Sequence, residues 1–268
     1  MKKTPLIGST VLLLGSVSMA PSVAAETASP AGLRQTLGIV AEVRSFSDHR
    51  GTLSSITVEE EIRRGDTTIV LAPTIGERDT PSATYDAVGM RGTVYQDWSP
   101  VVSTRTTVFL AEKTPVFAHI DVAQDVTVRV ADRTTVTAGI RWAEYDGGNE
   151  AAFASLGVRR YFEGGSIAYR LTGAEVDGDD FFAHLINLRL DDSEGGGSTQ
   201  LWLSVGDAAS SQFDDSFNAN NRSVTLQRTQ PLWDNVALVA AAGLSEYRSA
   251  GGHYTATTFR VGLSTMLD

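Results

Sequence analysis

Hydrophobic and polar residues alternate with a period of two over nearly the whole chain. Between Val116 and Val130 the even positions are mostly aliphatic, whereas the odd positions include Asp121 and Arg129. Residues 134–142 and 253–267 repeat this alternation. Because successive side chains of a strand point to opposite faces, these segments predict strands with one aliphatic and one polar face.

The same reading divides the chain into fourteen predicted strands, most of them 9 to 15 residues long. They lie near 35–46, 52–63, 67–77, 83–97, 101–111, 116–130, 134–145, 151–162, 165–173, 180–191, 199–209, 221–232, 236–247 and 253–267. Strands of soluble proteins usually have about five or six residues, whereas a tilted membrane-spanning strand needs about 9–11. The lengths therefore favour a transmembrane barrel.

The connections also alternate in kind. Tight turns such as 64–66 and 98–100 alternate with longer polar connections such as 174–179 and 210–220, and 192–198 is an exception on the short-turn side. This alternation is typical of outer-membrane barrels with both termini in the periplasm. We predict an all-β fold, a transmembrane antiparallel up-and-down barrel of about 14 strands over residues 35–268. The short outer connections predict little material for a folded-in constriction.

Charged residues recur on the predicted inward face. The expected lumen network consists of Glu42, Arg44, Glu59, Glu61, Arg91, Arg105, His119, Asp121, Asp125, Arg129, Arg141, Arg159, Arg189 and Arg260. A soluble β-sandwich or β-helix would also alternate, but a dry core could not hold so many charges, whereas a wet or ion-paired lumen can. Phe109, Phe117, Tyr95 and Tyr161 are expected in the same lumen, so both an open pore and a plugged barrel remain possible.

Aromatic residues near the strand ends predict two lipid-facing girdles. The periplasmic girdle would contain Trp98, Phe162 and Trp233, and the outer girdle would contain Tyr145, Phe181, Phe213 and Tyr247.

Residues 1–25 have the order of a cleaved secretory signal peptide. Lys2 and Lys3 precede an apolar run over 6–17, and small residues at 23–25 form the cleavage site. The run is too short for a transmembrane helix, and Pro21 follows it. Residues 26–34 would form a short periplasmic segment. We therefore expect export to the outer membrane of a Gram-negative-type envelope.

Composition narrows the class of protein further. A mean hydropathy of −0.07 excludes a polytopic helical membrane protein and argues against disorder. With 32 acidic against 22 basic side chains, binding to nucleic acid is not expected. The chain has no cysteine and hence no disulfide or thiolate site.

The sequence contains no recognisable catalytic or metal-binding motif, so we predict a protein that is not an enzyme and has no cofactor. The alternative is a lipid-acting hydrolase or acyltransferase that uses a histidine. His119 shares the inward face with Asp121, whereas His184 points outward. The acidic runs 177–180 and 214–215 could attract cations but lack EF-hand spacing.

Several strings resemble the YaiO-type outer-membrane β-barrel family. They are Thr114–Ala118, Thr199–Ser204 and Val224–Leu232, and the resemblance runs in order from about residue 36 to the C-terminus. It implies an outer-membrane barrel surrounded by lipid and lipopolysaccharide and inserted by the outer-membrane assembly machinery, but it brings no established activity. The ending Met266–Asp268 departs from the usual terminal aromatic residue. The expected role is structural or the passage of a solute or polysaccharide.

Overall fold

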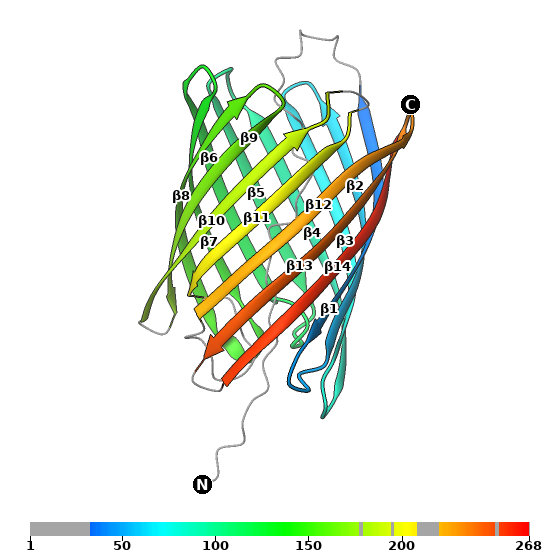
Figure 1. Cartoon of the computed structure of the whole chain (residues 1–268), viewed down its shortest axis with the longest axis vertical. Helices are drawn as coiled ribbons and strands as arrows, with labels where there is room; N and C mark the ends of the chain where they lie inside the picture. The colour runs from blue at the N-terminus through cyan, green and yellow to red at the C-terminus, as the bar shows by residue number, and fades with distance from the viewer. Residues whose placement is uncertain (1–32, 177–178, 194–195, 208–219, 250–251, 268) are drawn as a thin grey trace.

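The computed structural model describes residues 33–176, 179–193, 196–207, 220–249 and 252–267, and it forms a closed barrel of fourteen strands (Figure 1). The first seven strands are β1 (Arg34–Phe46), β2 (Thr52–Arg64), β3 (Thr67–Asp79), β4 (Thr84–Asp97), β5 (Val102–Ala111), β6 (Ile120–Ala131) and β7 (Thr134–Glu144). The others are β8 (Glu150–Phe162), β9 (Gly165–Val176), β10 (Asp179–Asp191), β11 (Ser198–Asp207), β12 (Asn220–Trp233), β13 (Val236–Ser249) and β14 (Gly252–Leu267). The fold class and the strand number predicted from the alternation are confirmed.

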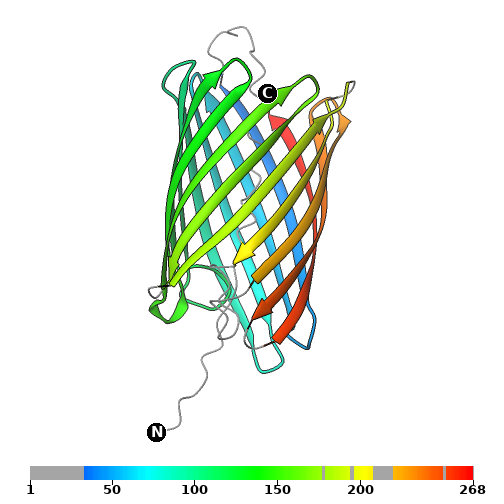
Figure 2. The same ribbon diagram turned by 60° about the vertical axis from the view of Figure 1, so that its left-hand side comes forward.

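The barrel closes through antiparallel pairing of β1 with β14. Their register runs from Gln35 opposite Leu267 to Phe46 opposite Ala256. Every other strand pairs with its neighbours in the chain, and the strands are steeply inclined in both ribbon views (Figure 2). Closure removes the two sheet edges, whose unpaired backbone groups could not be satisfied in lipid.

The barrel has two distinct ends. At the terminal end, β1 begins and β14 finishes, and short turns join β2 to β3 and β8 to β9. Gly65 and Gly164 occupy these two turns with φ of 57° and 75°, a conformation that favours glycine. The opposite end, called the loop end here, includes the connections 47–51, 80–83, 112–119 and 145–149.

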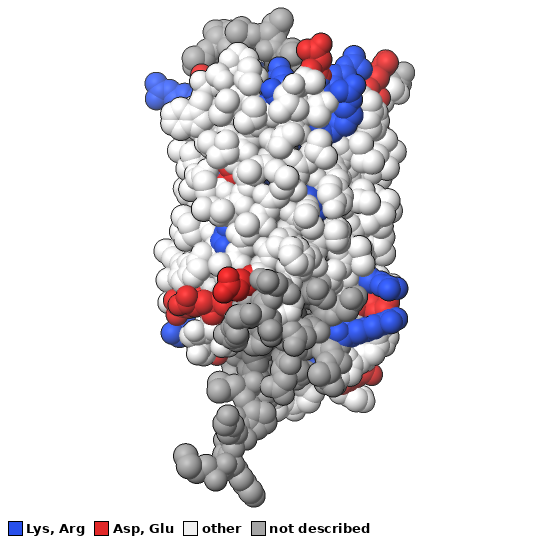
Figure 3. Space-filling model, turned by 90° about the vertical axis from the view of Figure 1, so that its left-hand side faces the viewer, with Lys and Arg blue, Asp and Glu red and all other residues white. Residues whose placement is uncertain are grey.

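Aliphatic side chains cover the outer surface. Ile140, Phe259 and Leu156 are 67%, 62% and 58% exposed, although all three are apolar. On the face in Figure 3, charged side chains gather toward the two ends and the band between them is almost free of charge. Among the described residues, no helix is long and apolar enough to cross a membrane.

The two predicted girdles have different outcomes. Trp98 and Trp233 at the terminal end are each 68% exposed, as a girdle requires, and the periplasmic girdle stays a prediction. The predicted outer girdle is wrong, because Tyr145, Phe181 and Tyr247 are 1%, 5% and 1% exposed and pack inside the barrel. Phe213 lies outside the described residues.

The connection between β5 and β6 folds into the barrel, contrary to the prediction of a strand from residue 116. The strand begins at Ile120 instead. Val116 and Ala118, expected to face lipid, are 0% and 1% exposed, and Phe117 is 9% exposed. The expectation that the outer connections leave little material for a folded-in constriction is therefore also wrong.

Candidate functional site in the barrel lumen

A cavity of about 1770 Å³ occupies the lumen and extends to the turns of the terminal end. Its lining there includes Asp66, Trp98, Asp132 and Asn235. Serine, threonine, glutamine and arginine side chains line much of the deeper wall. The cavity is larger than the roughly 300–1,000 Å³ of a typical small-molecule pocket.

The fourteen charged or histidine side chains expected in the lumen fall into two groups. Those that line the cavity are Glu42, Glu61, Arg105, Asp125, Arg129, Arg141, Arg159, Arg189 and Arg260. The other five are Arg44, Glu59, Arg91, His119 and Asp121, of which Arg44 and Asp121 are buried.

Ion pairs between side chains of different strands neutralise part of this charge. Arg260 Nε donates to Glu42 Oε2 over 2.9 Å, and these residues face each other across the β1–β14 closure. Arg91 Nη2 donates to Glu59 Oε2 over 2.9 Å. Close pairing of this kind offsets the cost of removing charges from bulk water.

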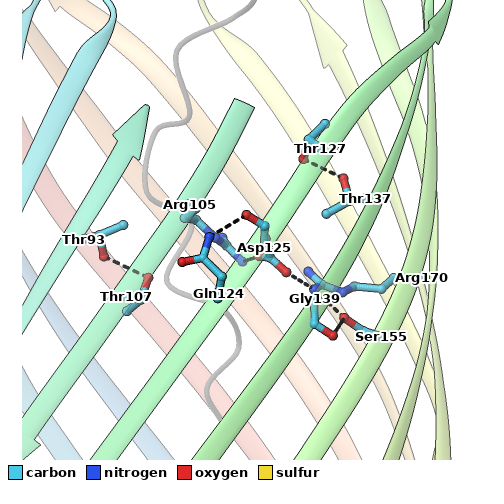
Figure 4. Close-up of polar contacts among 10 residues, drawn as sticks. All are labelled: Thr93, Arg105, Thr107, Gln124, Asp125, Thr127, Thr137, Gly139, Ser155 and Arg170. Carbon is cyan, nitrogen blue, oxygen red and sulfur yellow. Dashed lines mark hydrogen bonds and ion pairs between the residues drawn. The ribbon is translucent and has the colours of Figure 1, made fainter. Parts of the chain in front are cut away.

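Asp125 holds two arginines at once (Figure 4). Arg105 donates to its Oδ2, and Arg170 Nη2 donates to its Oδ1 over 2.5 Å. Arg170 also donates to Ser155 Oγ over 2.6 Å. A Cβ on Gly139 would lie 1.9 Å from Asp125 Oδ1, so only glycine leaves room for the carboxylate there.

Arg170 was absent from the predicted network, although the alternation within β9 could have identified it. It shares the cavity-lining face of β9 with Ser166, four positions before it, and with Thr172, two positions after it. The structure brings it to Asp125 across 45 positions of sequence, a pairing that no local pattern could indicate.

Six consecutive strands, β5 to β10, each contribute one arginine to the cavity lining. We call this set the arginine arc; it consists of Arg105, Arg129, Arg141, Arg159, Arg170 and Arg189. Among the described residues, the cavity-lining side chains of β11, β12 and β13 are all uncharged. The cavity therefore has a cationic wall beside a neutral polar one.

Aromatic and aliphatic side chains fill the lumen at the loop end. Phe117 packs edge-on against Phe109 with ring centroids 5.7 Å apart. A Cβ on Gly76 would lie 2.4 Å from the Phe117 ring, so this glycine makes room for it. We call residues 116–118, together with the two clusters that they contact, the loop-end plug.

The loop-end plug contacts two different parts of the barrel wall. Val116 and Phe117 belong to a cluster with Phe46, Leu53, Ala87, Tyr247, Tyr254 and Ala256. Ala118 belongs to a second cluster with Ala143, Tyr145, Ala151 and Phe181. The inward connection thus joins two parts of the wall. One is formed by β13, β14, β1, β2 and β4, and the other by β7, β8 and β10.

Neither of the two histidines considered for catalysis is hydrogen-bonded to a carboxylate in this structure. His119 Nδ1 lies 2.7 Å from the Ala111 carbonyl oxygen, while Asp121 accepts a 2.9 Å hydrogen bond from Arg141 Nε. His184 is exposed on the outer face, with Nδ1 2.8 Å from the Tyr169 hydroxyl. The shared face of His119 and Asp121 therefore does not produce a catalytic pair.

The acidic runs considered as cation sites fall largely outside the described residues. Asp214 and Asp215 lie outside the described residues, as do positions 177 and 178 of the other acidic run. Within the part of the chain that the structure describes, no three His, Asp or Glu side chains are grouped to hold a metal ion.

Comparison with known proteins identifies the barrel type. Residues 34–212 match the family model described as the YaiO membrane beta barrel domain, which confirms the resemblance seen in the sequence. The fold is similar to the CymD monoaromatic hydrocarbon channel, with 6% identity, a TM-score of 0.61 and 89% of each chain covered. It is also similar to a bacterial polysaccharide outer membrane secretin, with 9% identity, a TM-score of 0.58, and 87% of this chain and 98% of that chain covered. The outer membrane protein Omp33 of Acinetobacter baumannii matches at 9% identity and a TM-score of 0.50, over 88% of this chain and 100% of that one. At these identities the likeness shows the fold alone.

Proposed function

Because this chain belongs to the YaiO membrane β-barrel family, we propose that it is an outer-membrane channel for a hydrophilic solute. The observation that carries this proposal is the polar cavity of about 1770 Å³, which reaches the terminal end. A barrel with a purely structural role has no need of so large a polar space. The proposal assigns no catalytic step to the protein.

A non-conducting structural barrel is the second candidate, and the loop-end plug favours it. Val116, Phe117 and Ala118 are all buried where a solute would have to leave the lumen. In a channel, the same residues would form the constriction. The two candidates therefore differ in whether the plug lets ions and solutes pass.

Planar-bilayer recording with the purified, refolded full chain distinguishes the candidates. We expect discrete unitary current steps of small conductance, because the polar lumen admits ions and the apolar loop-end plug narrows their path. Folding is checked independently by the β-sheet circular dichroism spectrum and by heat-modifiable migration on a gel. A folded barrel that inserts and leaves the bilayer sealed would overturn the channel proposal.

We further propose that the terminal end faces the periplasm, after removal of residues 1–25 as a signal peptide. Both ends of the barrel sequence meet there, and outer-membrane barrels keep short turns on the periplasmic side. The loop end would then contact lipopolysaccharide, and the assembly machinery would insert the barrel from the periplasm.

Single cysteines test this orientation, because the chain has none of its own. Ser82 lies in an exposed connection at the loop end, and Asp132 lies in an exposed turn at the terminal end. The variants Ser82→Cys and Asp132→Cys therefore report on the two ends separately. On intact cells, a membrane-impermeant maleimide should label only Ser82→Cys, and Asp132→Cys should react after the outer membrane is permeabilised. The reverse labelling pattern would invert the assignment of the two ends. N-terminal sequencing of the mature protein tests the signal peptide, and a sequence that begins before Glu26 would contradict its removal.

A further inference from the structure

The arginine arc carries more positive charge than its carboxylate partners neutralise. Four of its six guanidinium groups hydrogen-bond to three carboxylates, those of Asp121, Asp125 and Asp191. Asp125 is shared between Arg105 and Arg170. Arg159 has a neutral partner, because its Nη1 donates to Ser166 Oγ over 3.1 Å. This wall of the lumen therefore presents a surplus of guanidinium donors, which suit carboxylate and phosphate groups.

The positive groups are held in place by the wall itself. The Asp125 side chain is 8% exposed, whereas the Arg105 and Arg170 side chains that it anchors remain 38% and 30% exposed toward the lumen. Side chains that are ordered before a ligand arrives lose less conformational entropy on binding. The arc is therefore a preorganised surface for anions.

The neighbouring wall offers hydrogen bonds without charge. Its cavity-lining amides and hydroxyls include those of Gln200, Ser204, Asn221, Ser223, Thr225 and Gln227. Such groups both donate and accept, which is what sugar hydroxyls require. Trp202, Tyr95 and Tyr161 add aromatic surface to the lining.

We propose that the lumen binds an oligosaccharide bearing carboxylate groups. Its acidic groups would lie on the arginine arc, and its hydroxyls would lie against β11 and β12. The volume of about 1770 Å³ gives room for several sugar units rather than one. This inference rests on the proposed passage function, because it names the class of solute that the channel would admit.

Isothermal titration of the refolded full chain in detergent tests the inference apart from conductance. The probe is a uronic acid hexamer, with maltohexaose as the neutral sugar and linear polyphosphate as a polyanion without sugar. We expect the uronic acid hexamer to bind at least about tenfold more tightly than either comparison ligand, because only it matches both walls. Polyphosphate binding of equal strength would show a general polyanion surface and overturn the saccharide assignment.

Two adjacent arginines on β8 provide a matched pair of variants. Arg159→Gln removes a cavity-lining charge and should weaken uronate binding about tenfold. Arg160→Gln removes an exposed charge on the opposite face, where Nη1 contacts Thr134 Oγ1, and should leave binding unchanged. Equal affinities in both variants and the parent protein would overturn the inference.

The binding and conductance results separate the two proposals. A conducting barrel that binds no uronic acid hexamer refutes the solute assignment and leaves the channel intact. A sealed barrel that binds the hexamer refutes passage and leaves the binding site. Arg129→Gln supplies a second arc variant if Arg159→Gln does not fold.

Discussion

Replacing Phe117 with alanine should raise the unitary conductance of the barrel severalfold. Phe117 is 9% exposed, and its ring fits against Gly76 and meets Phe109 edge-on. The substitution removes the largest side chain of residues 116–118, which join the two hydrophobic clusters. Because truncating a buried phenylalanine leaves a void that its surroundings only partly fill, we expect a wider and more mobile constriction. Planar-bilayer recording of both proteins at the same salt concentration measures the change.

Phe259→Ala is the matched control for this experiment. Phe259 is 62% exposed on the outer face of β14, so its truncation changes the lipid contact and leaves the lumen unaltered. Its conductance should equal that of the parent protein. If Phe117→Ala and Phe259→Ala conduct alike, residues 116–118 do not form the constriction.

Asp125→Asn should be the most destabilising single substitution of a charged residue in the lumen. Asp125 accepts hydrogen bonds from both Arg105 and Arg170, and its side chain is 8% exposed. The neutral amide would leave two neighbouring guanidinium groups without their shared counter-charge. Breaking a fully buried ion pair costs about 3–5 kcal/mol, and the partial exposure of both arginines reduces this to about 2–3 kcal/mol. Urea-induced unfolding in detergent micelles measures the loss.

Asp192→Asn is the control for the same chemistry at an exposed position. Asp192, in the turn between β10 and β11, hydrogen-bonds to Arg228 with both side chains about one-third exposed. Water screens an exposed ion pair and leaves it little net effect on stability, so this variant should unfold almost as the parent protein does. If Asp125→Asn unfolds at the same urea concentration as the parent protein, Asp125 does not stabilise the barrel wall.

The strands were predictable because their signal is local. A strand places every second side chain on one face, so alternation alone located all fourteen segments and the side of the wall on which most charges lie. The same alternation placed Arg105, Asp125 and Arg159 on the face that lines the cavity. Strand lengths then favoured a membrane barrel over a soluble sandwich.

The inward connection at 112–119 was missed because its residues continue the alternating pattern of β6. Val116 and Ala118 have the same parity as Val122 and Val126, which do face outward. Pro115 was the available signal, because proline lacks the backbone N–H that a strand ladder requires. The burial of Tyr145 and Tyr247 was missed with it, because they pack in the clusters that this connection contacts.

The sequence by itself determined the strands, the apolar outer face and the charged lumen, because each depends only on spacing along one strand. Tertiary structure decided which charges meet, since partners such as Asp125 and Arg170 come together only when the barrel curves and closes. It also decided that one end of the lumen is filled. Gly76 leaves room for the ring of Phe117 and Gly89 for the ring of Phe109, and these residues meet only in the folded barrel. Local alternation specifies the wall of this barrel, whereas long-range packing specifies what lies inside it.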